Sequence, residues 1–335
     1  MRKLIRDMLK TESYIKIVDE ATNGAEAVSM AQQYKPDIIT MDYTMPILNG
    51  AQATSEIVKN INPPPAVIML SAYTEKGARA TFDSLSSGAI DFIQKPSGEL
   101  SFDLDLIKES LVHKINIIYT AKKKIEYPTI NDNKASINHN TARNIEIIVI
   151  GASTGGPPLI ENIIASLPKN IKVPVLVIQH MPKKFTKSFA SRLNSLSNNN
   201  VKEAENNDEL KPGIILIAPG DYHTIINSNS KANKYKIIKL IQTPPIKGLR
   251  PSIDIAMDSV ATIYGHKALG ILLTGMGDDG AKGLEQIKQK GGHTIVQDPN
   301  TAVIDSMPMS AIKINAYDEI LDIPNIISKI NNLTK

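Results

Sequence analysis

The chain has 335 residues, which at the usual ~150 residues per domain corresponds to about two domains. With 42% hydrophobic residues, 21% charged residues and no cysteine, it is typical of a globular protein, and disulfide frameworks, thiolate nucleophiles and iron–sulfur clusters are excluded. The basic residues behind the net charge of +4 are scattered, aromatic residues amount to 4%, and no apolar run reaches the ~18 residues of a membrane span, so we expect neither nucleic-acid binding nor membrane insertion.

The first part of the chain alternates short apolar runs with segments of helical period. A helical pattern over 2–10 lacks the apolar core of a secretory signal, so the cytoplasm is the expected compartment. The predicted strands are 14–18, 38–41, 66–70 and 90–93, and an amphipathic helix is predicted over 104–118. This alternation is typical of a parallel sheet with crossover helices and predicts an α/β domain over residues 1–118.

A change of composition separates this domain from a second one. Residues 119–143 are rich in Lys, Asn and Ser and lack a periodic apolar pattern, which is typical of a linker. Beyond it we predict strands at 145–150, 173–178, 214–218, 268–274 and 293–296, helices at 157–167, 184–195, 252–264 and 279–290, and a hairpin from 222–227 and 235–241. The pattern predicts a doubly wound parallel-sheet domain over 144–335.

Polar side chains follow three successive predicted strands of the first domain. Asp42 follows the strand 38–41, Ser71 ends the next strand, and Lys95 ends the one after. Ligand chemistry gathers at the carboxyl edge of open parallel sheets, so an acid, a hydroxyl and an amine are expected on one rim. Each residue alone is equally well explained as a loop Asp, a capping Ser or a solvated Lys, but three in register favour a functional site.

The segments PDIITMDYTMPILNG, LSA and DFIQKP make residues 1 to about 118 resemble a two-component receiver domain, which has a flavodoxin-like fold. The resemblance implies that Asp42 is the phospho-acceptor, that Ser71, Phe92 and Lys95 form the switch around it, and that a chemotaxis histidine kinase is the phospho-donor. The chemistry is consistent, because an ammonium and a hydroxyl beside the carboxylate can hold phosphoryl oxygens.

The first strand of that fold, with the two acidic residues that hold Mg²⁺ for phosphorylation, is missing from this sequence. Asp19 and Glu20 end the next predicted strand and occupy a different place in the sheet, so they are not expected to replace the pair. We therefore expect an incomplete Mg²⁺ site, inefficient phosphorylation of Asp42 and exposed strand edges in this chain, and a true start about 15–20 residues upstream of Met1.

The second domain opens with a strand that runs into the glycine-rich loop 151–157, Gly-Ala-Ser-Thr-Gly-Gly-Pro. This loop predicts a sharp turn that presents Ser153 at the sheet edge, with helix N–H groups behind it. A dinucleotide fingerprint should be followed by a strand ending in Asp or Glu, but the next strand ends in Gln179 and His180. An α/β-hydrolase elbow matches G-x-S-x-G, although that family orders its triad Ser, acid, His and places the elbow mid-sheet rather than on the opening strand. A structural turn without chemistry stays open.

His180 ends the second strand of this domain on the rim of Ser153, which is the place for a general base. Strand 268–274 opens into Gly-Met-Gly-Asp-Asp-Gly at 275–280, from which a carboxylate can reach an imidazole and fix its tautomer. Two adjacent Asp residues and a His also suggest a metal site, but consecutive residues point apart and no second cluster supports it. The weaker candidate histidines are His113, His139, His223, His266 and His293.

Seven segments between about 145 and 315 resemble, in order, the catalytic domain of the chemotaxis receptor methylesterases: GASTGGP, VIQHMP, SFASRL, KPGIILIAPGDYH, RPSIDIAMDSVA, LLTGMGDDGAKGL and GGHTIVQDP. With the receiver-like half in front, the resemblance covers the whole chain. It implies Ser153 as nucleophile, His180 as base and Asp279 as orienting acid, with Thr154 and Met276 lining the site beside the oxyanion.

The resemblance further implies hydrolysis of glutamyl methyl esters on methyl-accepting chemoreceptors, and deamidation of receptor glutamines at the same site. The esterase would need no cofactor, and phosphorylation of the receiver half would regulate it. One departure is Ser306-Met307-Pro308, where the family commonly has Gly-Met-Pro. Two other functions stay open: a phospho-switched binding module in which Ser153 and His180 are structural, and a generic α/β-hydrolase that acts on small esters without a receptor.

Overall fold

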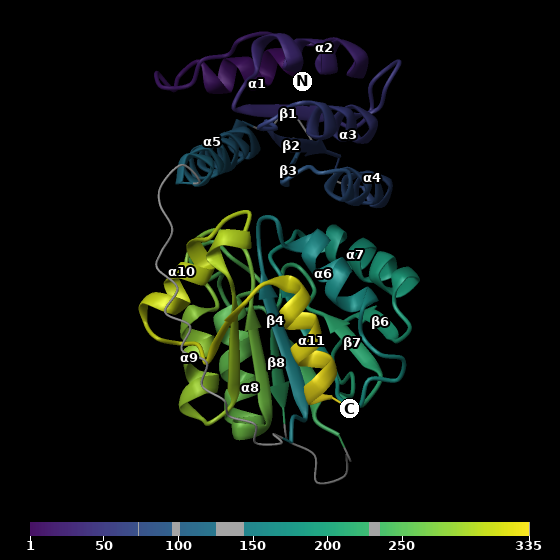
Figure 1. The fold of residues 1–335 in the computed structure, drawn as a ribbon, viewed down its shortest axis with the longest axis vertical. Helices are drawn as coiled ribbons and strands as arrows, with labels where there is room; N and C mark the ends of the chain where they lie inside the picture. The colour runs from purple at the N-terminus through teal and green to yellow at the C-terminus, as the bar shows by residue number, and fades with distance from the viewer. Residues whose placement is uncertain (73, 96–100, 125–143, 228–234, 335) are drawn as a thin grey trace. The chain divides into compact units, whose positions relative to one another are not determined.

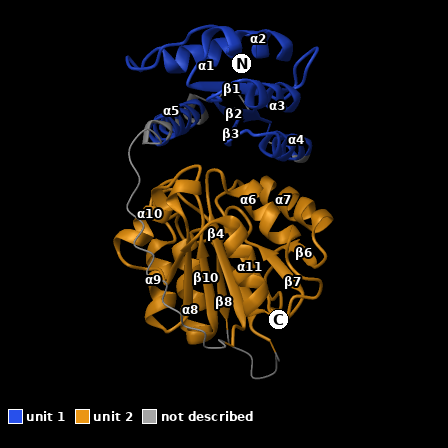
Figure 2. Ribbon diagram, in the orientation of Figure 1, with its two compact units in different colours: residues 1–123 blue, residues 124–335 orange. Residues whose placement is uncertain are grey.

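The structure is a computed structural model that describes residues 1–72, 74–95, 101–124, 144–227 and 235–334 (Figure 1). The chain divides into two compact units, residues 1–123 and 124–335 (Figure 2). The fold class predicted for both units is confirmed, since each has a parallel sheet with helices between its strands. Of the predicted linker, 125–143 lies outside the described residues. Among the described helices, none combines the length and the apolar character that a bilayer crossing requires.

The first unit has a three-stranded parallel sheet in the order β1-β2-β3. Its elements are α1 (Arg2–Leu9), α2 (Gly24–Tyr34), β1 (Ile38–Asp42), α3 (Gly50–Asn60), β2 (Ala66–Ser71), α4 (Glu75–Ser86), β3 (Asp91–Gln94) and α5 (Ser101–Lys124). The central strand β2 is buried throughout, whereas most of β1 is only half-buried. The reason is that, among the described residues, no strand pairs with the outer edge of β1.

The strand predicted at 14–18 is wrong, because these residues form no strand. In the predicted sheet order, their only neighbour would be the first strand of the fold, which the described residues do not include. The backbone groups of 14–18 would therefore have no ladder partner. Tyr14 and Val18 accordingly remain 61% and 46% exposed. Helix α5 is longer than predicted and includes residues 119–124, although this segment lacks a periodic apolar pattern.

The second unit has a seven-stranded parallel sheet in the order β12-β11-β10-β4-β5-β7-β6. The strands are β4 (Ile147–Ala152), β5 (Val175–Gln179), β6 (Asn200–Glu203), β7 (Ile214–Ile217), β10 (Ala268–Leu272), β11 (His293–Gln297) and β12 (Glu319–Leu321). The predicted hairpin is confirmed as the antiparallel pair β8 (His223–Asn227) and β9 (Ile237–Ile241). The opening strand β4 lies in the middle of the sheet, between β10 and β5.

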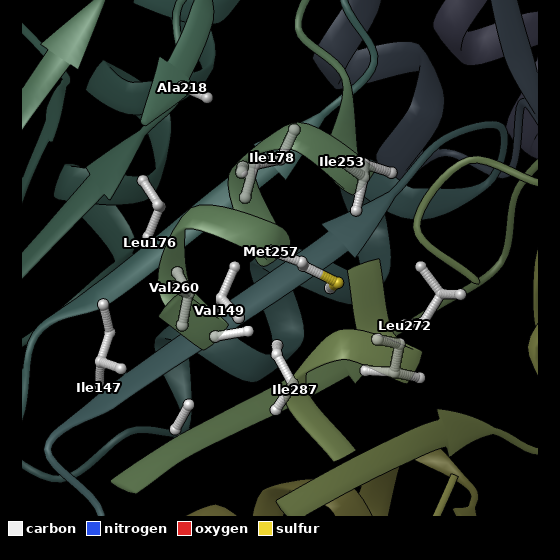
Figure 3. Close-up of a cluster of buried hydrophobic side chains, with 14 of the residues drawn as sticks. Ile147, Val149, Leu176, Ile178, Ala218, Ile253, Met257, Val260, Leu272 and Ile287 are labelled. Carbon is white, nitrogen blue, oxygen red and sulfur yellow. The ribbon is translucent and has the colours of Figure 1, made fainter. Parts of the chain in front are cut away.

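Helix α8 connects the core of this unit to the carboxyl edge of its sheet. The helices are α6 (Gly156–Ala165), α7 (Lys183–Leu196), α8 (Ile253–Tyr264), α9 (Ala281–Gln289), α10 (Ser306–Lys313) and α11 (Ile323–Leu333). Figure 3 shows Met257 and Val260 of α8 in one buried cluster with Val149 of β4. A Cβ at Gly151, near the end of β4, would clash with the side chain of Ile253. Glycine at this position therefore lets the first turn of α8 lie directly against the carboxyl end of β4.

An ion-pair cluster joins the edge strand β12 to the rest of the second unit. His293 Nε2 lies 2.6 Å from Glu319 Oε1, and Lys329 Nζ lies 2.8 Å from the same oxygen. The hydrogen bond from His293, opposed by burial and aided by Lys329, lowers the pKa of Glu319 from 4.5 to about 2. A carboxyl group with a lowered folded-state pKa stabilises the protein above its unfolded pKa, and that stabilisation is lost as the pH falls through the folded pKa.

We therefore expect Glu319→Gln to lower the free energy of unfolding of the second unit at neutral pH. The variant should also lose less of this free energy than the wild type between about pH 5 and about pH 2. Urea unfolding at several pH values measures both effects. Glu205→Gln is the matched control, because Glu205 is exposed and only pairs with Lys202. An acid-induced loss that is the same in Glu319→Gln and in the wild type would contradict the assignment.

Candidate active site

The loops that carry the three main candidate residues follow three adjacent strands. Ser153 comes directly after β4, His180 directly after β5, and Asp279 lies in the loop between β10 and α9. Because β4 pairs in parallel with both β10 and β5, the carboxyl ends of the three strands meet at one edge of the sheet. The sheet order therefore places a hydroxyl, an imidazole and a carboxylate on neighbouring loops.

The turn after β4 is held from two sides. The Gly156 N–H donates to the Ser153 carbonyl (2.9 Å), and the Ser153 N–H donates to the carbonyl of Thr274 (3.0 Å). A Cβ at Gly275 would lie 2.7 Å from the Cβ of Ser153, so glycine there lets the loop after β10 approach the serine. Ser153 is half-buried, and within the described part of the chain its hydroxyl makes no hydrogen bond. The hydroxyl is thus free for a substrate or a base.

Gln179, the buried last residue of β5, connects the serine loop to the histidine loop. Its Nε2 donates to the carbonyl of Ser153 (2.9 Å) and to that of His180 (3.2 Å). In the sequence, Gln179 spoke only against dinucleotide binding. The signal for this second role was a polar residue at the end of an otherwise apolar strand, because a buried amide needs hydrogen-bond partners.

The His180 ring is bonded on one nitrogen and free on the other. Its Nε2 lies 2.8 Å from Oδ2 of Asp279, and the two side chains are only 8% and 6% exposed. Its Nδ1 is buried and has no hydrogen-bond partner among the described residues. Because an ionised carboxylate only accepts hydrogen bonds, Nε2 carries the proton, and the lone pair on Nδ1 is available to take another.

The Asp279 carboxylate accepts hydrogen bonds from the first turn of α8 as well as from His180. The donors are the hydroxyl of Ser252 (2.9 Å), the N–H of Ile253 (2.7 Å) and the N–H of Asp254 (3.1 Å). Burial raises the pKa of Asp279, but the hydrogen bond and charge of His180 and the two backbone N–H groups outweigh it and hold the pKa below its ordinary value. Asp279 therefore stays ionised at neutral pH beside the imidazole.

The neighbouring acid Asp278 points away from this arrangement. Its side chain is 51% exposed and pairs with Lys247 Nζ at 2.6 Å. Asp254, which also lies nearby, accepts from the N–H groups of Gly280 and Gly283 and so caps α9. Within the described ranges, no group of three or more His, Cys, Asp or Glu residues has the arrangement of a metal site.

The loop 275–277 carries Met276 and is hydrogen-bonded to the start of α10. Ser306 Oγ donates to the carbonyl of Gly275 (2.9 Å) and accepts from the N–H of Gly277 (3.2 Å), so it fixes the residues on both sides of Met276. The Met276 N–H has no hydrogen-bond partner in the described part of the chain. The carbonyl of buried Thr154 accepts from the hydroxyl of Thr274 (3.0 Å). A free backbone donor thus lies on the loop next to Ser153.

In the first unit, the structure joins Asp42 to Lys95 but not to the hydroxyl of Ser71. Lys95 Nζ lies 2.7 and 2.6 Å from the two carboxylate oxygens of Asp42. Ser71 Oγ instead accepts from Thr81 Oγ1 (2.6 Å) and donates to the carbonyl of Gly77 (3.2 Å), both in α4. Phe92 on β3 is buried. The acid and the amine thus form the predicted pair, whereas the hydroxyl is turned into α4.

The described residues around Asp42 do not fit a Mg²⁺ site. Asp19 accepts from the N–H of Glu20 (2.8 Å), and the carboxylate of Glu20 pairs with Arg6 (2.8 Å). The two acids are therefore engaged with their own segment and with α1. No third acid completes a cluster in the described ranges. The incomplete Mg²⁺ site stays a prediction from the sequence.

Comparisons with known proteins cover both units. The CheB methylesterase family model matches residues 148–330, and the response regulator receiver domain model matches residues 1–102. A protein-glutamate methylesterase/protein-glutamine glutaminase from Methanococcus maripaludis is 39% identical over 96% of this chain and 92% of its own length. The protein of the same name from Thermotoga maritima is 40% identical over 99% and 95%. The crystal structure of the Thermotoga maritima CheB methylesterase catalytic domain matches with a TM-score of 0.54 and 43% identity, over 56% of this chain and 98% of that one.

Proposed function

The chain belongs to the family of CheB protein-glutamate methylesterases/protein-glutamine glutaminases with a receiver domain, and we propose that Ser153, His180 and Asp279 catalyse its reaction on chemoreceptors. The observation that carries the assignment is the contact between His180 Nε2 and Asp279, which leaves the buried Nδ1 of the ring unpaired. Such an imidazole, oriented by an acid, is what a serine nucleophile requires of its base. No cofactor takes part in the proposed esterase reaction.

In the proposed mechanism, Nδ1 of His180 takes the proton of the Ser153 hydroxyl while Oγ attacks the carbonyl carbon of a glutamyl methyl ester. The N–H of Met276 and a backbone N–H near Thr154 hold the oxyanion of the tetrahedral intermediate. The ester C–O bond then breaks, His180 returns the proton to the leaving methoxide, and methanol departs. Water, deprotonated by His180, then attacks the acyl carbon, and His180 returns this proton to Oγ of Ser153 as the bond from Oγ to the glutamate breaks. With a glutamine substrate the leaving group is ammonia.

The generic α/β-hydrolase alternative loses one of the arguments against it. The opening strand β4 lies mid-sheet, as a hydrolase elbow does, so its place in the sheet does not separate the two families. The order of the catalytic residues along the chain does separate the two families, because His180 precedes Asp279, whereas α/β-hydrolases place the acid before the histidine. Together with the names of the relatives, this order favours the glutamyl methyl ester of a receptor as the substrate.

Methanol release from receptor membranes methylated beforehand tests the proposal. We expect the wild-type protein to release methanol from them. Hydrolysis of small esters without any release from the receptor would support the generic hydrolase instead. Receptor binding that depends on phosphorylation, with no hydrolysis at all, would support the binding module.

We further propose that the receiver unit is regulatory and that it inhibits the esterase until a chemotaxis histidine kinase phosphorylates Asp42. The pair of Asp42 with Lys95 supports this role, since the ammonium that now holds the carboxylate can hold a phosphoryl group. The kinase, the receptor signalling domains and this protein would meet in the cytoplasm. Because the described residues do not fit a Mg²⁺ site, phosphorylation of Asp42 in this 335-residue chain is expected to be inefficient.

A fragment that starts near Thr141 is therefore expected to release methanol at a rate at least equal to that of the unphosphorylated full chain, and phospho-donors should not change this rate. The physical reason is that the fragment lacks the proposed inhibitory unit while retaining all three catalytic residues. Initial rates at equal concentrations of folded protein measure the difference. A fragment that is folded but less active than the full chain would contradict the inhibitory role.

A further inference from the structure

A chain of hydrogen bonds leads from Asp279 into the interior of the second unit. It runs through Ser252, the residue before α8, to His223 in β8, and both side chains are fully buried. Neither residue takes part in the mechanism proposed above, and from the sequence alone His223 is one of the weaker candidate histidines. Buried polar groups of this kind are retained only with their hydrogen bonds made, so each contact along the chain constrains the next.

The hydroxyl of Ser252 has two partners that fix its direction. It accepts from the N–H of Ile255 (3.4 Å) as the N-cap of α8, and it donates to Oδ1 of Asp279 (2.9 Å). A serine has a single hydroxyl hydrogen, so this hydrogen is committed to the carboxylate. Oδ2 of Asp279 remains for Ile253 N–H and for His180. The serine thus anchors one carboxylate oxygen while the other oxygen faces the imidazole.

His223 fixes the backbone of Ser252. Its Nδ1 accepts the Ser252 N–H (3.1 Å), and its Nε2 lies 3.2 Å from the carbonyl of Pro244. A backbone N–H can only donate and a carbonyl can only accept, so the ring is neutral with its proton on Nε2. This tautomer ties Ser252 to β8 and to the segment before Arg250.

We propose that Ser252 is a positioning residue of the methylesterase reaction, which fixes the Asp279 carboxylate in the orientation that holds His180, and that His223 holds Ser252 in place. The proposal rests on the catalytic roles proposed above. The loop 275–280 contains three glycines, Gly275, Gly277 and Gly280, and such a loop has little rigidity of its own. Its acid is therefore held from outside, by the first turn of α8.

The test is a kinetic comparison in the full-length protein. Ser252→Ala is expected to lower kcat for methanol release about tenfold or more with KM unchanged, because it removes a hydrogen bond to a charged group without touching the substrate. Ser252→Thr keeps the hydroxyl and is expected to restore most of kcat. Ser252→Gly removes the donor but remains a good N-cap residue, so it reports on the same contact if Ser252→Ala folds poorly.

A double-mutant cycle separates positioning from general destabilisation. In the Asp279→Asn background, Ser252→Ala is expected to add little further loss, because the group through which it acts has been changed. Asp322→Ala is the matched control: it removes the N-cap of α11, where Asp322 accepts from the N–H of Asn325 (3.0 Å), and should leave kcat unchanged.

Two results would overturn the inference while the proposed function stands. One is an active wild type with unchanged kcat in both Ser252→Ala and Ser252→Gly. The other is a loss from Ser252→Ala that is as large in the Asp279→Asn background as in the wild type. A wild type that releases no methanol would instead overturn the proposed function, and this inference with it.

Discussion

Ser153→Ala is expected to lower methanol release from methylated receptors by about three orders of magnitude or more, and His180→Gln by a comparable factor. The first change removes the attacking oxygen, and the second removes the Nδ1 lone pair that would take its proton. Initial rates at saturating methylated receptor give the comparison. Because the hydroxyl of Ser153 makes no hydrogen bond within the described residues, the free energy of unfolding should change little in Ser153→Ala.

The two substitutions should not be additive. Residues that act in the same catalytic step do not contribute independently to the rate, so the double variant is expected to be about as slow as either single variant. Ser191→Ala is a matched control, since Ser191 lies exposed on α7 and its hydroxyl only bonds to the carbonyl of Lys187 (3.1 Å). Wild-type turnover in Ser153→Ala would rule out the serine as nucleophile.

The second large effect is expected for Asp279→Asn, which should lower methanol release by about 10² to 10⁴-fold. One oxygen of the Asp279 carboxylate accepts a hydrogen bond from His180, and both oxygens accept hydrogen bonds from the start of α8. The side-chain amide of the variant must therefore direct an N–H group at one of these donors. The lost acceptor also removes the charge that stabilises the protonated imidazole during the reaction. The same variant should unfold at lower urea concentration, because donors at the start of α8 are left unpaired.

Asp278→Asn provides the control for this prediction. Asp278 is the adjacent residue, carries the same charge and is exposed in its pair with Lys247, so its amide variant should keep most of the activity. Equal losses in Asp278→Asn and Asp279→Asn would mean that the loop, rather than the buried carboxylate, limits the rate. The assignment of the orienting acid would then be wrong.

The central strands were predictable because each is a short apolar run between turn residues, as in β4 and β10. The two edge strands of the second sheet, β6 and β12, were not predicted. They are short, and their sequences Asn-Val-Lys-Glu and Glu-Ile-Leu carry too few apolar residues to be distinguished from loops. The strand predicted at 14–18 had the right composition but lacked a partner, which is a property of the sheet and not of the segment.

The candidate catalytic residues were predictable because each follows a strand, and parallel strands end at one edge. The residues that support them were not. Ser252 and His223 lie on different elements from Asp279. The packing of α8 against β4 brings Ser252 to Asp279, and His223 on β8 contacts Ser252. The helix predicted at 252–264 has Ser252 as its first residue, but the sequence does not indicate that the hydroxyl of Ser252 meets the carboxylate of Asp279.

If Ser153 opens the methyl ester by acyl transfer, the oxygen of water enters the glutamyl carboxylate and not the methanol. Methylated receptor membranes are incubated with wild-type protein or with Ser153→Ala in water enriched in heavy oxygen, and both products are analysed by mass spectrometry. The account predicts rapid methanol release by the wild type, with heavy oxygen in the glutamyl carboxylate and none in the methanol, and almost no release by Ser153→Ala. Heavy oxygen in the methanol, or wild-type release by Ser153→Ala, would contradict it.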